Sequence, residues 1–485
     1  MIAVRHVANL LIFLPMIVGA GGLLFQVRGE RIWVAGVAAL CLALAGSLAA
    51  VVSPHLGISL FGIDWVLCDW APHWQFDLGF KIDFFASGQG FIAAWLMLAG
   101  FLIGRESFSK HRSKLAAGLT LSTAVLGAVF SSNLLTFLAF SALASLFSVF
   151  LLGLDRSRVG VGDSIKFGMA ALASELLLLV CVLGANKSLM VTDIFQIALL
   201  GHSVSGETIL FFIFMAAAFL KAPIPPFHPH WSSVFRSSET EHLLPVAVLG
   251  GLGLYLVFRF APTIYPAELR EYSKVLMVLG MIAILFGGFY SFRARGVRAW
   301  LFASELVFSG LAVSGFSSLT SMGWLGGWII YWFGALALAF SIGLCIVAER
   351  RASAFGADVL QDAPVFALAS TGALLSVAGM PITILYFGIV FVYGGAAHAF
   401  GGFSWIALIS LPLIFGGLIY RLFFYFQAGI DSGGSGKFED LSSAERMALL
   451  PVLIFLILTL LGSSVILDNV GGAIKDAISV LGAGA

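Results

Sequence analysis

Residues 208–231, TILFFIFMAAAFLKAPIPPFHPHW, decide the fold class of this chain. Thirteen uncharged residues lead to Lys221, and prolines follow at positions 223, 225, 226 and 229. Proline cannot continue a helical hydrogen-bond ladder, so the pattern predicts a membrane helix that breaks just after a buried lysine. Broken helices at membrane depth occur where they line a cavity or pack against protein, and they recur at ion sites. The stretch therefore indicates a polytopic membrane protein with an ion site.

The composition of the whole chain agrees with a membrane protein. Of 485 residues, 60% are apolar and 11% are charged, against about 25% charged in soluble proteins. The 26 Lys and Arg residues nearly balance the 25 Asp and Glu residues, which argues against nucleic acid as a partner. The four cysteines lie too far apart for a metal knuckle or a redox motif, so we expect no metal and no cofactor in this chain: Cys41, Cys68, Cys181 and Cys345.

Fourteen apolar segments are long enough to cross a bilayer, which takes about 20 residues. The fold class expected is all-α and polytopic, with spans near 7–27, 33–53, 84–104, 115–131, 133–153, 167–186, 208–222, 243–261, 273–292, 299–317, 324–348, 366–394, 403–427 and 447–467.

The basic residues orient these spans, because Lys and Arg concentrate in cytoplasmic loops. Six lie on the side that would be external: Arg5, Lys81, Lys187, Arg270, Lys274 and Lys475. Seventeen of the 26 lie on the other side: Arg28, Arg31, Arg105, Lys110, Arg112, Lys114, Arg156, Arg158, Lys166, Arg236, Arg293, Arg295, Arg298, Arg350, Arg351, Lys437 and Arg446. The bias predicts a multi-pass protein of a bacterial-type inner (cytoplasmic) membrane with both termini outside the cytoplasm.

The spans group into blocks. The proline-interrupted spans, with a break at 221–226 in one block and near Pro381 in another, predict two five-helix repeats of inverted orientation. The external loop 54–82 should form a cap with a short hairpin, and residues 438–445 a short amphipathic helix. The expected organisation is 1–114 (three helices and the loop 54–82), 115–261 (first repeat), 273–427 (second repeat), 428–446 (cytoplasmic linker) and 447–485 (last helix and tail).

Ionisable residues within the spans are the first functional hypotheses, because a charge in hydrocarbon costs at least about 2.5–3.5 kcal/mol. Lys221 stands out because it precedes the helix break, and Glu175 lies in the preceding span, which should be its neighbour. Glu305 lies nearer the cytoplasmic end of its span. Lys221 and Glu175 could instead serve only to hold helices together, and Glu305 could be explained by its proximity to the cytoplasmic interface. Arg259 and Arg421 lie at span ends and are expected to reach the membrane interface.

Two histidines follow the break. His228 and His230 stand in a His-Pro-His sequence, and His242 comes twelve residues later. No cysteine or carboxylate completes a metal set at a recognisable spacing. A proton relay or a structural contact is the better hypothesis for His228, because histidine titrates near neutral pH.

Residues 219–228, FLKAPIPPFH, resemble the signature of the antiporter-like membrane subunits of respiratory complex I. That family includes the M, L and N subunits of bacterial NADH:quinone oxidoreductase, membrane subunits of energy-converting hydrogenases, and Mrp-type cation/proton antiporters. The signature is a lysine, a proline two residues on, another proline, Pro-Phe-His and a tryptophan, here Trp231 and displaced by one residue. Further stretches similar to the family lie at 81–83, 251–260, 296–304, 378–383 and 420–424.

The resemblance implies fourteen spans with external termini and a buried glutamate paired with a buried lysine in each half-channel. Changing the charge of one member alters the proton affinity of the other. The chain departs from this pattern, because the family glutamate of the fifth span falls on Ala142. Three other buried family positions also lack a charge here: Gly251, Phe308 and Ile389.

Three functions follow as alternatives. The first is a proton-translocating subunit of a complex I-like or energy-converting hydrogenase-like oxidoreductase, with Lys221, Glu175, Glu305 and His228 as its candidate site. The second is a divergent, non-conducting scaffold subunit of such a complex. The third is a membrane subunit of a cation/proton antiporter or of an inorganic-carbon uptake system. All three imply a lipid bilayer, protons or sodium ions, and partner subunits. The first two imply membrane and peripheral redox subunits, since the chain should carry no electrons itself.

Overall fold

The fold comes from a computed structural model of the full chain. The structure describes residues 2–53, 60–61, 63–71, 76–154, 161–189, 207–237, 240–294, 296–351, 362–381, 383–402, 417, 439–461 and 471. The chain divides into two compact units. The first unit holds the residues up to Ala222 together with Phe227–Glu271. The second holds Pro223–Pro226 and the chain from Tyr272 onward.

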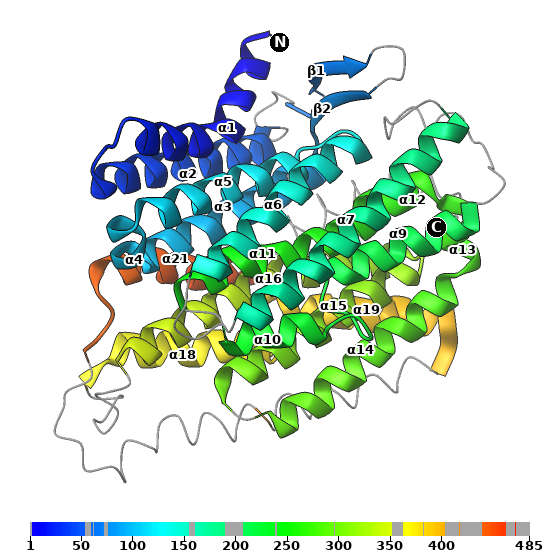
Figure 1. The fold of residues 1–485 in the computed structure, drawn as a ribbon. Coiled ribbons are helices and arrows are strands. Elements are labelled where there is room, and N and C mark those ends of the chain that lie inside the picture. The colour runs from blue at the N-terminus through cyan, green and yellow to red at the C-terminus, as the bar shows by residue number, and fades with distance from the viewer. Residues whose placement is uncertain are drawn as a thin grey trace. The chain divides into compact units, whose positions relative to one another are not determined.

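The first unit is a bundle of apolar helices (Figure 1). Neighbours along the chain pack on one another, as α1 does on α2 and α5 does on α6. Its helices are α1 (Ile2–Leu24), α2 (Gly29–Val52), α3 (Phe84–Ile103), α4 (Arg105–Lys110), α5 (Arg112–Val129), α6 (Leu134–Leu154), α7 (Val161–Leu189), α9 (Glu207–Lys221), α10 (Pro229–Ser237), α11 (Thr240–Tyr255), a π-helical segment η3 (Leu256–Phe260), α12 (Ala261–Ile264) and α13 (Pro266–Glu271).

A hairpin lies in the loop between α2 and α3. Strands β1 (Ile63–Ala71) and β2 (Phe76–Ile82) pair antiparallel, with Trp65 opposite Phe80. The Lys81 amide donates to the Phe130 carbonyl, and the Ser132 amide donates to the Gly79 carbonyl, so β2 is bonded to the α5–α6 junction. The hairpin expected in this loop is confirmed. Its two strands are an exception to the expected all-α fold class.

The second unit is also helical. Helix α16 packs on both α15 and α19, and α14 packs on α15. Buried residues make up 94% of the apolar windows of α15 and α16 but only 22% of that of α1, so α15 and α16 are interior helices. The helices of this unit are α14 (Ser273–Arg293), α15 (Val297–Ser317), α16 (Ser321–Arg350), α18 (Pro364–Val377), α19 (Ile384–Phe400) and α21 (Ser443–Leu461).

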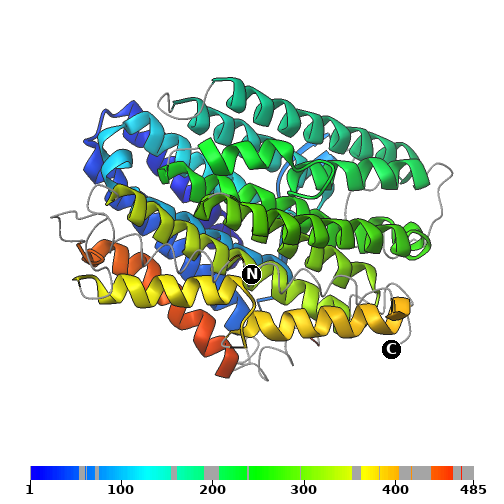
Figure 2. The same cartoon turned by 90° about the horizontal axis from the view of Figure 1, so that it is seen from below.

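Two expected spans are interrupted in the described structure. Helix α9 ends at Lys221 and α10 begins at Pro229, because the intervening prolines cannot donate to the helical ladder. Helix α18 ends at Val377 and α19 begins at Ile384, with Gly379 at a φ of +73° in the connection. Positive φ suits glycine, which has no Cβ. Figure 2 shows α18 in yellow and α19 in gold, end to end.

The chain is a helical membrane protein. Eight described helices are long and apolar enough to cross a membrane, and four shorter apolar helices accompany them: Thr208–Lys221, Val248–Ile264, Pro364–Val377 and Ile384–Phe400. The expected span 403–427 lies almost wholly outside the described residues, as does Arg421.

The amphipathic helix expected at 438–445 is wrong over 439–442, and its residues 443–445 open the last described helix. Residues 439–442 are not helical, and α21 begins at Ser443. The reason is a capping box: the Ser442 amide donates to Glu445 Oε2 at 2.8 Å, and the Glu445 amide donates to Ser442 Oγ at 3.4 Å. This reciprocal pair fixes the helix start at the residue after Ser442.

Candidate functional site

The first unit contains a buried ion pair between two helices. Lys221 Nζ donates to Glu175 Oε1, and the two side chains are 4% and 10% exposed. The sequence placed both residues within spans and named Glu175 as a candidate acid for Lys221. The structure brings them together.

The pair lies at the middle of a long helix. Helix α7 has 29 residues, and Glu175 is its central residue. At a rise of 1.5 Å per residue, Glu175 is about 21 Å from either helix end. Lys221 is the last residue of α9, so the helix break is at this same depth. A broken helix next to a charged pair in mid-helix is the arrangement found at ion sites in membrane transporters.

Two serine hydroxyls complete the shell of the carboxylate. Ser141 Oγ donates to Glu175 Oε2 at 2.9 Å, and Ser145 Oγ donates to Glu175 Oε1 at 2.8 Å. The serines are four residues apart on α6, so they share one face of that helix. Both carboxylate oxygens therefore accept hydrogen bonds from α6. Sequence reasoning missed both residues, although Ser141 adjoins Ala142, where the family pattern expects a glutamate.

Backbone contacts fix the register of the helices that carry the pair. Ser174 Oγ donates to the Ala217 carbonyl at 2.8 Å, which ties α7 to α9 one turn before Lys221. Gly253 of α11 lies against the end of α9: a Cβ there would be 2.4 Å from the Ala218 carbonyl oxygen and 2.9 Å from Lys221 Cβ. The position of Lys221 therefore depends on close approach of α11.

A second buried ion pair lies elsewhere in this unit. Arg259 of η3 contacts Asp83 through both guanidinium nitrogens, at 2.9 and 2.8 Å. It also donates to the Tyr255 hydroxyl at 2.7 Å, and this hydroxyl donates to the Val129 carbonyl at 2.6 Å. The Arg259 side chain is 6% exposed, so protein groups surround it, and its expected place at the membrane interface stays a prediction. The Asp83 carboxylate compensates the buried charge and caps α3 by accepting from the Ala86 amide.

Glu305 belongs to the second unit and lies on α15. Among the described residues, no hydrogen bond or ion pair is recorded for its carboxylate. Arg298, one of the nearest cations in sequence, is bound instead to Glu349 of α16, at 2.6 and 2.5 Å. The structure therefore gives Glu305 no charged partner of the kind that Glu175 has.

His228 lies in the connection between α9 and α10, and His230 in the first turn of α10. The ring of His230 is 5.9 Å from that of Phe167 on α7, so α10 packs against α7 near these histidines. Among the described residues, no three His, Cys, Asp or Glu side chains gather as metal ligands would.

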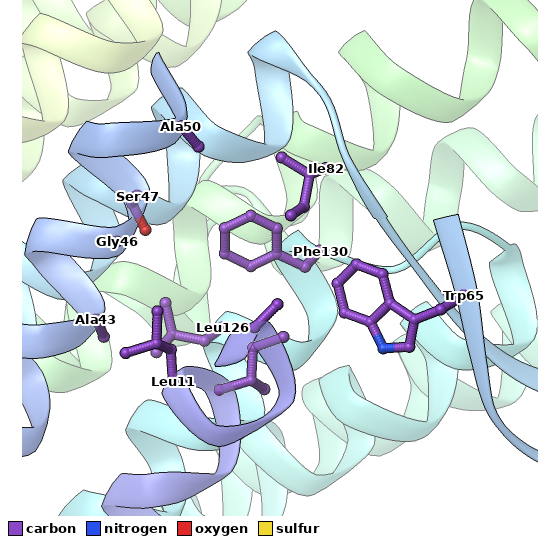
Figure 3. Close-up of a pocket in the computed structure, with 11 residues that line it drawn as sticks. Leu11, Ala43, Gly46, Ser47, Ala50, Trp65, Ile82, Leu126 and Phe130 are labelled. Carbon is purple, nitrogen blue, oxygen red and sulfur yellow. The ribbon is translucent and has the colours of Figure 1, made fainter. Parts of the chain in front are cut away.

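An apolar pocket lies between α1, α2 and the hairpin (Figure 3). Trp65 closes one side, and its indole Nε1 donates to Asn9 Oδ1 at 2.8 Å. Ser47 is the one hydroxyl in the lining, and none of the lining residues is ionisable. The pocket therefore has no group that could take up or release a proton.

Comparisons with known proteins agree with this arrangement. The family model for the transmembrane part of NADH:quinone oxidoreductase and Mrp antiporter proteins matches residues 131–414, more than half of the chain. NADH-quinone oxidoreductase subunit 13 of Thermus thermophilus is 27% identical over 71% of this chain and 74% of its own length. Subunit N of Trichlorobacter lovleyi is 25% identical over 49% of this chain and 52% of its own.

Solved structures show the same fold. A chain of respiratory complex I from Thermus thermophilus has a TM-score of 0.83 at 20% identity, over 98% of this chain and 99% of that one. A chain of the Mrp complex from Dietzia sp. has a TM-score of 0.84 at 16% identity, with the same coverage. These relatives are subunits of multi-subunit complexes. The family match, supported by this fold, establishes that the chain belongs to the NADH:quinone oxidoreductase/Mrp antiporter transmembrane family.

Proposed function

We propose that this chain is a proton-translocating subunit of a complex I-like or energy-converting hydrogenase-like oxidoreductase. One observation carries the proposal: Glu175 and Lys221 form a buried pair of opposite charge beside a helix break. The partner carboxylate expected on the fifth span is replaced by one on α7, so the loss of a charge at Ala142 does not leave Lys221 alone.

The pair supports a simple charge cycle. A proton that reaches Glu175 neutralises the carboxylate and removes the attraction that holds the ammonium. Lys221 is then a buried cation without a counter-charge, which is unfavourable, so it releases its proton toward the opened helix end. Ionisation of Glu175 and reprotonation of Lys221 restore the pair. Protons fit better than sodium ions, because an ammonium group has three donors and no acceptor for a metal cation.

The wider architecture belongs to the same proposal. We infer fourteen spans, with two inverted repeats at 115–261 and 273–427. In each block the interrupted helix is the fourth expected span, and the boundary between the compact units, at Glu271 and Tyr272, lies between the blocks. Residues 1–114, 428–446 and 447–485 supply the first three spans, a cytoplasmic linker and the last span with its tail. The basic-residue bias supports a bacterial-type cytoplasmic membrane with both termini outside.

Partners would supply the energy. Membrane subunits and peripheral redox subunits would surround this chain, which would carry no cofactor of its own. The relatives named above are parts of such complexes. Glu305 and His228 remain proposed members of the route.

A scaffold is the second candidate function, favoured by the uncharged residues at Ala142 and Gly251. It would keep the ion pair only to hold α7 against α9. An antiporter or inorganic-carbon uptake subunit has no separate observation in its favour beyond the shared fold.

Proton uptake by vesicles that hold the assembled complex separates these functions. Lys221→Ala should lower proton uptake per electron transferred by at least about tenfold, a loss of more than about 1.4 kcal/mol in transition-state stabilisation. Lys221→Arg should not restore it, because guanidinium does not release its proton at working pH.

Lys110→Ala is the matched control. This lysine lies on α4, is 71% exposed and pairs with Glu106 at the surface, so its loss should leave uptake unchanged. Normal pumping by an assembled Lys221→Ala complex would rule out conduction through the pair and favour the scaffold.

A further inference from the structure

The interface between α6 and α7, called the seam below, has different side chains in the two directions along the helices from Glu175. Four residues of α7 share the face that carries Glu175, at spacings of four, three and four: Ser164, Gly168, Ala171 and Glu175. On α6, Ser141, Ser145 and Ser148 share the facing side, because two of them bind Glu175. From Glu175 toward the α6–α7 connection, this face of α7 carries small side chains, and α6 carries Ser148 followed by the buried Leu152.

The other direction is apolar. Beyond Glu175, α7 buries Leu178 and Val182 on this face, and α6 buries Leu134 and Leu138. Water between such side chains would lack the two to four polar partners that buried water needs. Access to the carboxylate is thus expected from one side only.

Two buried hydroxyls of the polar side have no partner. Ser148 is 0% exposed and Ser164 is 6% exposed, and neither hydroxyl has a hydrogen bond within the part of the chain that the structure describes. Some buried helical serines bond to their own backbone, as Ser122 does to the Gly118 carbonyl at 2.9 Å, whereas Ser87, Ser309, Ser314 and Ser370 share the unpaired state of Ser148 and Ser164. A buried hydroxyl left unsatisfied costs about 1–3 kcal/mol, and buried water is the usual remedy.

The spacing of these hydroxyls suits a file of water. Ser148 is one turn beyond Ser145, which already holds the carboxylate. Ser164 is eleven residues from Glu175, about 16 Å along the helix. Gly168 lies between these levels and has no side chain, and the Val149 side chain packs against it: a Cβ on Gly168 would be 3.3 Å from Val149 Cγ2. The seam ends near Lys166 and Asp163, whose exposed ion pair marks the surface.

We propose that this α6–α7 seam is the proton access route to Glu175, with water held by Ser164 and Ser148. A proton passes from water to a Glu175 oxygen, which becomes a carboxylic acid, while the water file returns to its neutral form. The role of the route rests on the proposed function, but the presence of water in the seam does not.

Cysteine accessibility tests the seam directly. In the assembled complex, the four native cysteines of this chain are replaced by alanine, and Ser148→Cys and Ser164→Cys are introduced one at a time. The probe is 2-aminoethyl methanethiosulfonate, a small cation that forms a mixed disulfide with a thiolate and releases methanesulfinate. Thiolates form only where water reaches. The readout is the mass of the intact chain over time.

Ser122→Cys is the matched control, since this equally buried serine bonds to its own helix. Both seam cysteines should react at least about ten times faster than Cys at 122, and their modification should lower proton uptake. Rates equal to the control would overturn the route. Fast labelling with full proton uptake would show a wet seam that protons do not use, and would overturn it as well.

Glu175→Gln in the same vesicles separates the two proposals. If this variant loses proton uptake but the seam cysteines do not react, the proposed function stands and the proposed access route is wrong. Normal uptake in this variant would remove the proposed function, whatever the labelling shows.

Discussion

At the residue scale, the Glu175 carboxylate has three donors around it: Lys221, Ser141 and Ser145. Removing one partner of a buried ion pair typically costs about 3–5 kcal/mol, because the other charge stays buried without compensation. Replacing both partners with neutral groups of similar size costs far less. This asymmetry separates a structural contribution of the pair from a functional one.

The prediction uses single and double variants. Glu175→Gln alone should lower the thermal stability of the assembled complex, because Lys221 is buried and loses its counter-charge. Adding Lys221→Met should restore most of that stability but none of the proton uptake. Stability is measured as the temperature at which the complex dissociates on a native gel. If the double variant pumps normally, the pair is structural only.

The sequence predicted part of this site. Lys221 and Glu175 are recognisable because a charge within an apolar span is expensive and rarely incidental. Ser141 and Ser145 are not, because a serine in a helix most often bonds to its own backbone or to a neighbouring helix. The partner of Arg259 could not be predicted for a related reason: only the fold brings Asp83 next to it.

At the scale of elements, the close approach of α11 to α9 positions Lys221 without any charged contact. A Cβ on Gly253 would be 2.4 Å from the Ala218 carbonyl oxygen and 2.5 Å from the Ala222 amide. Both are backbone atoms, so α9 or α11 would have to move. Local sequence cannot show this contact, because it joins helices that only the fold brings together.

Gly253→Ala should therefore lower proton uptake severalfold although it changes no ionisable group. The control is Gly153→Ala on α6, where an added Cβ meets no atom within 4 Å. That change should be neutral or slightly stabilising, since alanine is favoured over glycine in helices by about 1 kcal/mol. Electron transfer and proton uptake are measured together. Equal behaviour of the two variants would show that Lys221 does not depend on this contact.

Sequence patterns for other elements succeeded where a local cause is sufficient. The first prolines after Lys221 follow the end of α9, and Pro381 follows the end of α18, since proline interrupts the helix in which it stands. The π-helical turn at η3 and the register of the hairpin have no such local signal. The start of α21 did carry one, because Ser442 and Glu445 have the spacing of a capping box.

At the scale of the whole molecule, orientation follows from the loops. Seventeen of the 26 basic residues lie on one side of the expected spans, and short loops rich in Lys and Arg stay in the cytoplasm. The same orientation would place the α6–α7 connection, and with it the polar end of the seam, on the cytoplasmic side. Proton uptake from the cytoplasm and termini outside it therefore both follow from one predicted orientation of the chain.

Single cysteines in intact cells test this orientation, in a chain without native cysteines. Lys274→Cys at the start of α14 should react with a membrane-impermeant maleimide added outside, whereas Arg112→Cys at the start of α5 should react only after the cells are opened. Both side chains are exposed in the structure, so access is not limited by burial. The opposite pattern would reverse the chain in the membrane and place the polar end of the seam outside. Labelling of both positions from outside would mean that the span count between them is wrong. Five expected spans separate these two residues only if 115–131 and 133–153 cross separately.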